Sequence, residues 1–217
     1  MTTRELSFVH EFRPATAHGR PPLLLLHGTG GDEHDLIGLG AAVAPGAALL
    51  SPRGQALEGG MPRFFRRLSE GVFDEDDVRR RAADIARFVG EARAAYGIAA
   101  PIALGFSNGA NIAAAVRLLH PGVLSGAILL RGMVPLATPP AAASVATPAL
   151  LLSGDRDPIV LAENAARLAA QLSRAGGEVE HRVLPTGHGL TQVDIELAAD
   201  WIGRQAKAVG EERAVAS

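Results

Sequence analysis

Short runs of apolar residues recur along the chain and predict a set of buried strands. These runs lie at 23–26, 47–50, 102–105, 126–130 and 149–152. A short, continuous apolar run is typical of a strand that is covered on both faces. In the stretches 6–12 and 179–183, mostly apolar side chains instead alternate with mostly polar ones. This alternation predicts half-exposed strands for the first and the last predicted strand.

Apolar residues spaced three to four positions apart predict helices between these strands. The clearest pattern covers 78–96, with acidic residues at 74–77 before it and Gly97 after it, as suits the two ends of a helix. Further helices are predicted at 111–119, at 161–172 and around 193–201. Strands that alternate with helices predict an α/β fold, in which a mostly parallel central sheet carries helices on both faces.

Two stretches do not follow this alternation. The first, 54–73, is long for a connection and contains Met61, Phe64 and Phe65, whereas 135–148 is rich in proline and alanine and predicts a surface connection. The aromatic rings of 54–73 are more typical of a core than of a pocket, although a pocket is the alternative, and its arginines, Arg63 included, are expected to be mostly solvated. Neither stretch is long enough to predict a large lid domain, and the polar tail after about residue 208 is expected to fray.

Composition narrows the class of protein. A chain of 217 residues favours a single domain, 1–217, and its balance of apolar and charged residues excludes a disordered protein. The net charge of −2 leaves no basic footprint for nucleic acid or for an acidic membrane surface. Without a cysteine, a signal-peptide pattern or an apolar run that spans a bilayer, the chain is expected to be cytoplasmic and without integral membrane association.

The segment Gly105-Phe106-Ser107-Asn108-Gly109 carries the clearest chemical signal. It joins a predicted buried strand to an alanine-rich predicted helix, which is the context of a G-x-S-x-G nucleophile elbow. The turn is so tight that the residues flanking the serine must lack bulk, and the serine oxygen then stands above the sheet. The plainer alternative is that Ser107 only caps the helix.

A nucleophilic serine needs a histidine base and a third group that orients the histidine. Asp155 and Asp157 follow the predicted strand at 149–152, and His188 follows the last strand, so both loops lie at the carboxyl edge of the sheet with Ser107. The order Ser, Asp, His is that of α/β-hydrolases, and both aspartates remain candidates for the acid. His27 is interpreted as a support for its own loop.

The loop 26–31 follows the first buried strand and contains three glycines. Such a loop supplies a backbone donor to an oxyanion hole, and we expect the amides of Thr29 and Asn108 to serve. Asp32 and Glu33 are more consistent with a solvated or capping role than with a metal site, and no metal-ligand spacing occurs. We therefore expect no metal and no cofactor.

Four segments in order give the chain a family resemblance: 26–33, 105–109, 154–160 and 187–190. It resembles the small carboxylesterase/phospholipase group of α/β-hydrolases, which includes acyl-protein thioesterases and bacterial carboxylesterases. The resemblance implies an α/β-hydrolase fold and selects Asp157 over Asp155, because the family's acid stands directly before a proline. Asn108 departs from the family's common glutamine, and Thr29 replaces a frequently apolar residue, which affects the acyl pocket wall.

The resulting hypothesis is a serine hydrolase of carboxylic esters, with Ser107, Asp157 and His188 as the catalytic residues. Its expected substrates are small to medium acyl or aryl esters, with thioesters and lysophospholipids as further options, and the expected pocket residues are Met61, Phe64, Phe65 and Met133. Two alternatives are a catalytically silent ligand-binding protein of the same fold and an enzyme similar to dienelactone hydrolases, whose usual nucleophile is cysteine. A small-molecule ester is the expected partner, and a homodimer is one option for assembly.

Overall fold

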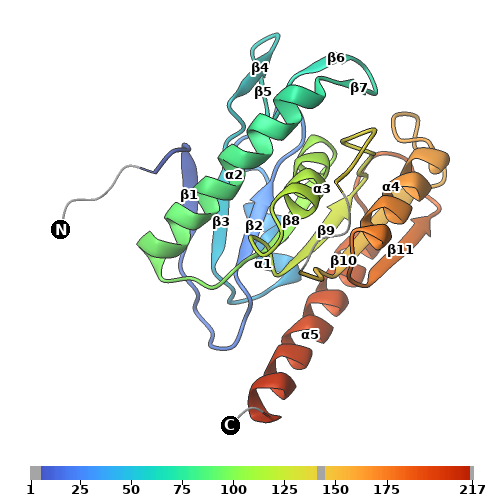
Figure 1. Cartoon of the computed structure of the whole chain (residues 1–217). Coiled ribbons are helices and arrows are strands. Elements are labelled where there is room, and N and C mark those ends of the chain that lie inside the picture. The colour runs from blue at the N-terminus through green and yellow to red at the C-terminus, as the bar shows by residue number, and fades with distance from the viewer. Residues whose placement is uncertain (1–5, 141–144, 216–217) are drawn as a thin grey trace.

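A computed structural model describes residues 6–140 and 145–215, and within them a seven-stranded sheet forms the centre of the fold (Figure 1). In spatial order the strands are β1 (His10–Arg13), β3 (Leu49–Pro52), β2 (Leu23–Leu26), β8 (Ile102–Phe106), β9 (Gly126–Leu130), β10 (Ala149–Gly154) and β11 (Val179–Leu184). Only the β1–β3 pairing in this sheet is antiparallel, so the mostly parallel sheet predicted from the sequence is confirmed.

Helices cover both faces of the sheet, as the alternating pattern predicts (Figure 1). One face carries α2 (Glu75–Tyr96), α3 (Asn108–Leu119) and α4 (Ala162–Arg174), and the other carries α1 (Ile37–Val43) and α5 (Gln192–Val215). The leucines of β2 alternate between these layers, since Leu24 and Leu26 pack toward α2–α4 while Leu23 and Leu25 pack toward α1 and α5. All four are fully buried, which explains why the strand is apolar without interruption.

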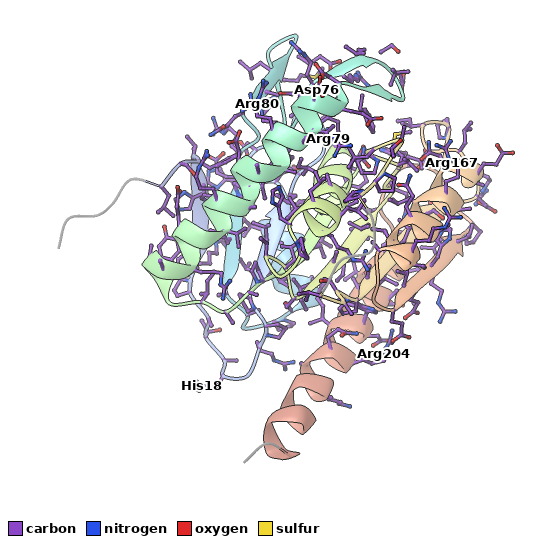
Figure 2. All side chains as sticks on the ribbon, in the orientation of Figure 1. His18, Asp76, Arg79, Arg80, Arg167 and Arg204 are labelled. Carbon is purple, nitrogen blue, oxygen red and sulfur yellow. The ribbon has the colours of Figure 1, made fainter. Side chains whose placement is uncertain are left out.

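The longest predicted helix has the ends that its sequence indicates. Asp74 caps α2 by accepting a hydrogen bond from the amide of Asp77 (3.1 Å), and Gly97 ends it in a left-handed conformation with φ of 66°. Figure 2 shows the side chains of Asp76, Arg79 and Arg80 on the outer side of this helix, where all three are exposed. The polar positions of the pattern therefore face solvent, and the apolar ones face the sheet.

The structure departs from the predicted pattern in three places. The stretch 54–73 forms two hairpins, β4 (Ala56–Glu58) with β5 (Met61–Arg63) and β6 (Arg67–Ser69) with β7 (Val72–Phe73), where we expected a long connection. The first hairpin turns through Gly59-Gly60, a pair that tolerates the positive φ angles of such a turn.

Helix α1 was not predicted, because its two glycines weaken the helical pattern. Helix α5 extends to Val215, well beyond the predicted range around 193–201, because Glu211, Glu212, Arg213 and Ala214 favour a helix there. The predicted surface connection at 135–148 includes 141–144, which lie outside the described residues. Across the two described ranges, every helix is too short or too polar to span a bilayer.

Candidate active site

Ser107 occupies the sharp turn between β8 and α3. Its backbone has φ of 52° and ψ of −113°, a conformation that a residue with a side chain rarely adopts. Its amide donates to the carbonyl of Leu130 in the neighbouring strand (2.9 Å), which ties the turn to β9. Ser107 stands at the N-cap position of α3, but its side chain makes no capping hydrogen bond. The hydroxyl is therefore available to another partner.

The glycines on either side of Ser107 are required by close backbone approaches. A Cβ atom at Gly109 would lie 1.8 Å from the carbonyl oxygen of Leu26, and one at Gly105 would lie 2.4 Å from the carbonyl oxygen of Gly109. Any larger residue at these positions would push α3 away from β2 and β8. The G-x-S-x-G spacing thus follows from the steric demands of the turn.

His188 connects Ser107 to Asp157. The His188 Nε2 atom lies 3.0 Å from Ser107 Oγ, and Nδ1 lies 2.8 Å from Asp157 Oδ2. A carboxylate beside Nδ1 favours the tautomer with its proton there, which leaves Nε2 to accept the serine proton. The three side chains come from the carboxyl ends of β8, β10 and β11, so the sheet brings together residues far apart in the sequence.

The Asp157 carboxylate is buried and well supplied with hydrogen bonds. Its Oδ1 accepts from the amides of Ile159 (2.8 Å) and Val160 (3.0 Å), while Oδ2 faces His188. Burial raises the pKa of Asp157, but the two amides and His188 outweigh burial and bring the pKa below its usual value. The group is therefore negatively charged at neutral pH. Asp155, the other candidate, is exposed and pairs with Arg156.

The predicted oxyanion loop is held by the first hairpin. Arg63 Nη1 donates to Thr29 Oγ1 (2.9 Å), and the amide of Gly30 donates to the carbonyl of Pro62 (2.9 Å). On the other side of the site, the amide of Phe64 donates to Asn108 Oδ1 (2.7 Å). The hairpin and Phe64, which directly follows it, therefore contact both residues whose amides we expect to stabilise an oxyanion.

Arg63 corrects the expectation that the arginines of this stretch are solvated. Its guanidinium is buried, 3.3 Å from Glu58 Oε2 and above the ring of Phe65, with 5.9 Å to the ring centroid. The sequence contained no periodicity that distinguishes it from its exposed neighbours, because hairpin strands of three residues are too short to show one. Only the fold brings Arg63 next to Thr29.

His27 supports the same loop from within the core, consistent with its interpretation as a loop support. Its Nδ1 lies 2.6 Å from the carbonyl of Gly28, and its Nε2 accepts from the amide of Gly54 (2.9 Å), so the ring is neutral with its proton on Nδ1. Burial lowers its pKa. A second proton at Nε2 would break the bond to Gly54, which joins the oxyanion loop to the start of the hairpins.

This arrangement predicts acid sensitivity of the fold. The unfolded chain takes up a proton at His27 below about pH 6.5, whereas the folded protein does not until a lower pH, so the free energy of unfolding falls as pH decreases. His27→Gln should therefore show a smaller loss of Tm between pH 7.5 and pH 5.5 than the wild type, measured by thermal unfolding. His18→Gln, at an exposed position (Figure 2), is the control and should follow the wild type; equal pH dependence in all three proteins would contradict the prediction.

The four predicted pocket residues separate into two groups. Phe64 and Phe65 are buried in the core with α2 and α3, at 2% and 0% exposed, so the structure places both rings in the core and not in an open pocket wall. Met61 is 46% exposed, and its Sδ would lie 3.6 Å from a Cβ atom added at Gly30 in the oxyanion loop. Met133, nearly buried, follows β9 and faces Gly71 of the second hairpin.

A second serine–histidine pair lies inside the sheet. Ser153 Oγ is 2.8 Å from His181 Nε2, and the two residues belong to the regular strands β10 and β11. Ser153 lacks the turn that exposes a nucleophile, and among the described residues no carboxylate bonds to the other nitrogen of His181. This pair therefore lacks the orienting acid and the elbow that accompany Ser107.

Two further features bear on what the site can do. A surface cavity of about 450 Å³ lies near the beginning of β8, lined by Pro22, Ile102 and Ser125 among others, and thus at the opposite edge of the sheet from Ser107. Within the described ranges, no three histidine, aspartate or glutamate side chains are arranged to hold a metal ion.

Comparison of the chain with known proteins identifies its family. Residues 13–205 match the family model described as Phospholipase/Carboxylesterase. The chain is 44% identical to the protein named "Putative hydrolase MhqD" of Bacillus subtilis (strain 168) over 181 residues, which cover 82% of this chain and 90% of that protein. The chain thus belongs to the phospholipase/carboxylesterase family of α/β-hydrolases, and it is a carboxylesterase-family hydrolase of the class that cleaves ester bonds.

Solved structures agree with this assignment. The carboxylesterase of Bacillus cereus is 38% identical, with a TM-score of 0.88 over 92% of this chain and 95% of that one. A carboxylesterase from Mesorhizobium loti is 33% identical, with a TM-score of 0.87 over 92% of this chain and 96% of that one. The α/β-hydrolase fold predicted from the sequence is therefore confirmed.

Proposed function

We propose that the protein is a serine esterase in which Ser107 is the nucleophile, His188 the general base and acid, and Asp157 the orienting acid. The observation that carries the proposal is the continuous chain of hydrogen bonds from Asp157 through His188 to Ser107, at 2.8 and 3.0 Å, on a backbone-strained elbow. Backbone strain of this kind persists only where the surrounding structure holds it, and it is common at active sites.

The reaction runs in two halves. His188 Nε2 takes the proton of Ser107 as Oγ attacks the ester carbonyl, and the amides of Thr29 and Asn108 stabilise the oxyanion. Asn108 is the first residue of α3, so its N–H has no partner within the helix and is available for this role. His188 then protonates the leaving alcohol, and water hydrolyses the acyl-enzyme by the reverse sequence of proton transfers. Asp157 stabilises the imidazolium that forms in each half.

Small to medium acyl or aryl esters are the proposed substrates. Carboxylic esters as the substrate class are supported by two solved structures of carboxylesterases, which are 38% and 33% identical to this chain. Met61 is the residue best suited to contact the acyl or alcohol group, because it is exposed and lies beside the oxyanion loop. Thioesters and lysophospholipids are tested as further substrates of the same nucleophile.

The proposal is tested by active-site labelling and a substrate series. A fluorophosphonate probe should modify Ser107, located by mass spectrometry of the peptide, and nitrophenyl esters of increasing acyl length should be hydrolysed with a burst of nitrophenol. A lysophospholipid and an acyl-thioester are assayed alongside them. A wild-type protein that neither reacts with the probe nor hydrolyses any member of the series would instead be a ligand-binding protein of this fold.

Met61→Ala should change ester selectivity without unfolding the protein. Loss of one apolar contact alters the preference between short and bulky esters by about 1–3 kcal/mol, which is measured as the ratio of kcat/KM values for an acetyl and a benzoyl nitrophenyl ester. Leu57→Ala is the matched control, because Leu57 is also exposed on this hairpin but lies on its opposite face.

Phe64→Ala provides the contrasting case. Removing a fully buried ring should lower the free energy of unfolding by about 3–5 kcal/mol. If Met61→Ala leaves the selectivity ratio at the wild-type value while Phe64→Ala changes it at constant stability, the proposed pocket wall is wrong.

A further inference from the structure

Arg131 is a fully buried arginine directly after β9, the strand that neighbours β8 and its Ser107 elbow. Its φ of 55° is a backbone conformation that residues with side chains seldom adopt. An arginine without solvent contact must find partners for all of its donors, because unpaired buried groups are costly. Those partners show what the residue holds in position.

All five N–H donors of the guanidinium have acceptors. Nε donates to the carbonyl of Gly187 (3.1 Å), Nη1 to the carbonyl of Leu152 (3.3 Å) and to Asp194 Oδ1 (2.7 Å), and Nη2 to the carbonyl of Gly189 (3.0 Å) and to Asp194 Oδ2 (2.8 Å). Gly187 and Gly189 are the two neighbours of His188 in the sequence. The guanidinium is therefore hydrogen-bonded to the histidine loop on both sides of His188.

Asp194 connects the Arg131 guanidinium to α5. It lies in the first turn of the helix, is 1% exposed, and besides the two bonds from Arg131 it accepts hydrogen bonds from the amide and the hydroxyl of Thr191, both at 2.8 Å. The histidine loop is thus fastened between the end of β9 and the beginning of α5. A glycine-flanked loop has little stiffness of its own, so its conformation depends on these bonds.

We propose that Arg131, held by Asp194, is a positioning residue that keeps the imidazole of His188 in line between Ser107 and Asp157. The inference rests on the proposed function. A buried ion pair contributes little net stability compared with apolar residues of similar volume, and the positive φ adds a cost, so stability alone does not account for this arrangement. A displacement of His188 by about 1 Å, in contrast, is enough to cost on the order of 10² in rate.

The chain offers a matched control in Arg117. This residue of α3 is also buried, and its guanidinium donates to the carbonyls of Thr147, Leu172 and Gly176. It lies nine residues, roughly 14 Å along the helix, from the end that carries Ser107. Arg117 therefore resembles Arg131 in burial and hydrogen bonding but does not contact the histidine loop.

The experiment compares Arg131→Lys and Asp194→Asn with Arg117→Lys. For each variant, kcat and KM are measured on a nitrophenyl ester, and Tm is measured by thermal unfolding. The concentration of active sites used to calculate kcat is taken from the burst of nitrophenol. We expect Arg131→Lys to lower kcat on the order of 10²-fold with little change in KM, and Asp194→Asn to act in the same direction. Arg117→Lys should lower Tm but retain kcat. A kcat near the wild-type value in both Arg131→Lys and Asp194→Asn overturns the proposal.

A rescue experiment separates positioning from mere packing. Arg131→Gly leaves a guanidinium-sized space, and glycine readily adopts the positive φ at this position. Guanidinium chloride, well below denaturing concentration, should restore part of kcat in Arg131→Gly, whereas an equal concentration of sodium chloride should not. No rescue, together with equal losses of activity and Tm in all the arginine variants, would assign Arg131 to structure alone.

Failure of the proposed function would look different. The wild-type protein itself would then lack a probe-reactive Ser107 and a burst, before any arginine variant is considered. If the wild type reacts at Ser107 but the Arg131 and Asp194 variants retain kcat as Arg117→Lys does, the esterase mechanism stands and the positioning role of Arg131 is wrong.

Discussion

Replacing Ser107 with alanine is expected to lower kcat for ester hydrolysis by about 10⁴- to 10⁶-fold while leaving the fold intact. The substitution removes the oxygen that faces His188 Nε2 at 3.0 Å, and no acyl-enzyme can then form. Alanine retains the Cβ atom and adds no bulk to the elbow, so Tm should stay near that of the wild type. Steady-state kinetics on a nitrophenyl ester, thermal unfolding and loss of fluorophosphonate labelling measure these three outcomes.

Ser153→Ala is the matched control for this prediction. Ser153 is a buried serine that also lies within hydrogen-bond distance of a histidine, so its removal tests whether any serine–histidine pair suffices. We expect it to retain activity, because Ser153 sits in a regular strand and lacks an orienting acid. The opposite result, an active Ser107→Ala and an inactive Ser153→Ala, would move the reaction to the pair inside the sheet.

Asp157→Asn is expected to lower kcat by about 10⁴-fold. The carboxamide keeps one oxygen, which the amides of Ile159 and Val160 hold, so its NH₂ group is turned toward His188 Nδ1. Nδ1 must then act as an acceptor, which places the imidazole proton on Nε2, where it can no longer take the proton of Ser107. The variant should fold, since the two amide bonds that fix the loop remain.

Asp155→Asn provides the comparison within the same loop. Asp155 is exposed and its carboxylate pairs with Arg156, an interaction that solvent screens. We expect kcat within a small factor of the wild-type value, measured in the same assay. An inactive Asp155→Asn beside an active Asp157→Asn would show that the acid was assigned to the wrong residue.

The parts of the site that depend on local sterics were accessible to sequence reasoning. The glycines beside Ser107 are required by contacts closer than 2.5 Å to neighbouring backbone, and such a requirement leaves a recognisable spacing in the sequence. The loops that carry Asp157 and His188 were found because both follow strands of a parallel sheet, whose carboxyl ends meet at one edge. The apolar pattern of each strand then sufficed to assign its loop to that edge.

Other features depended on packing that no local pattern records. The residue types and spacing around Phe64 and Phe65 are compatible with a position in the core or in a pocket. The path of the hairpins places both rings in the core. Arg63 was expected in solvent but lies against Thr29, because β5 folds back over the oxyanion loop. Each outcome is set by the direction in which a short hairpin leaves the sheet.

The sequence by itself determined the alternation of strands and helices, the elbow at Ser107 and the order of the candidate residues, because periodicity and glycine sterics act over a few neighbouring positions. The tertiary structure placed Asp157, which the family resemblance had selected, against His188, and it alone joined Arg131 to Asp194, 63 positions further along the chain. Such partners are selected by burial and by the acceptors that the fold leaves unpaired, and these quantities exist only once distant segments have come together.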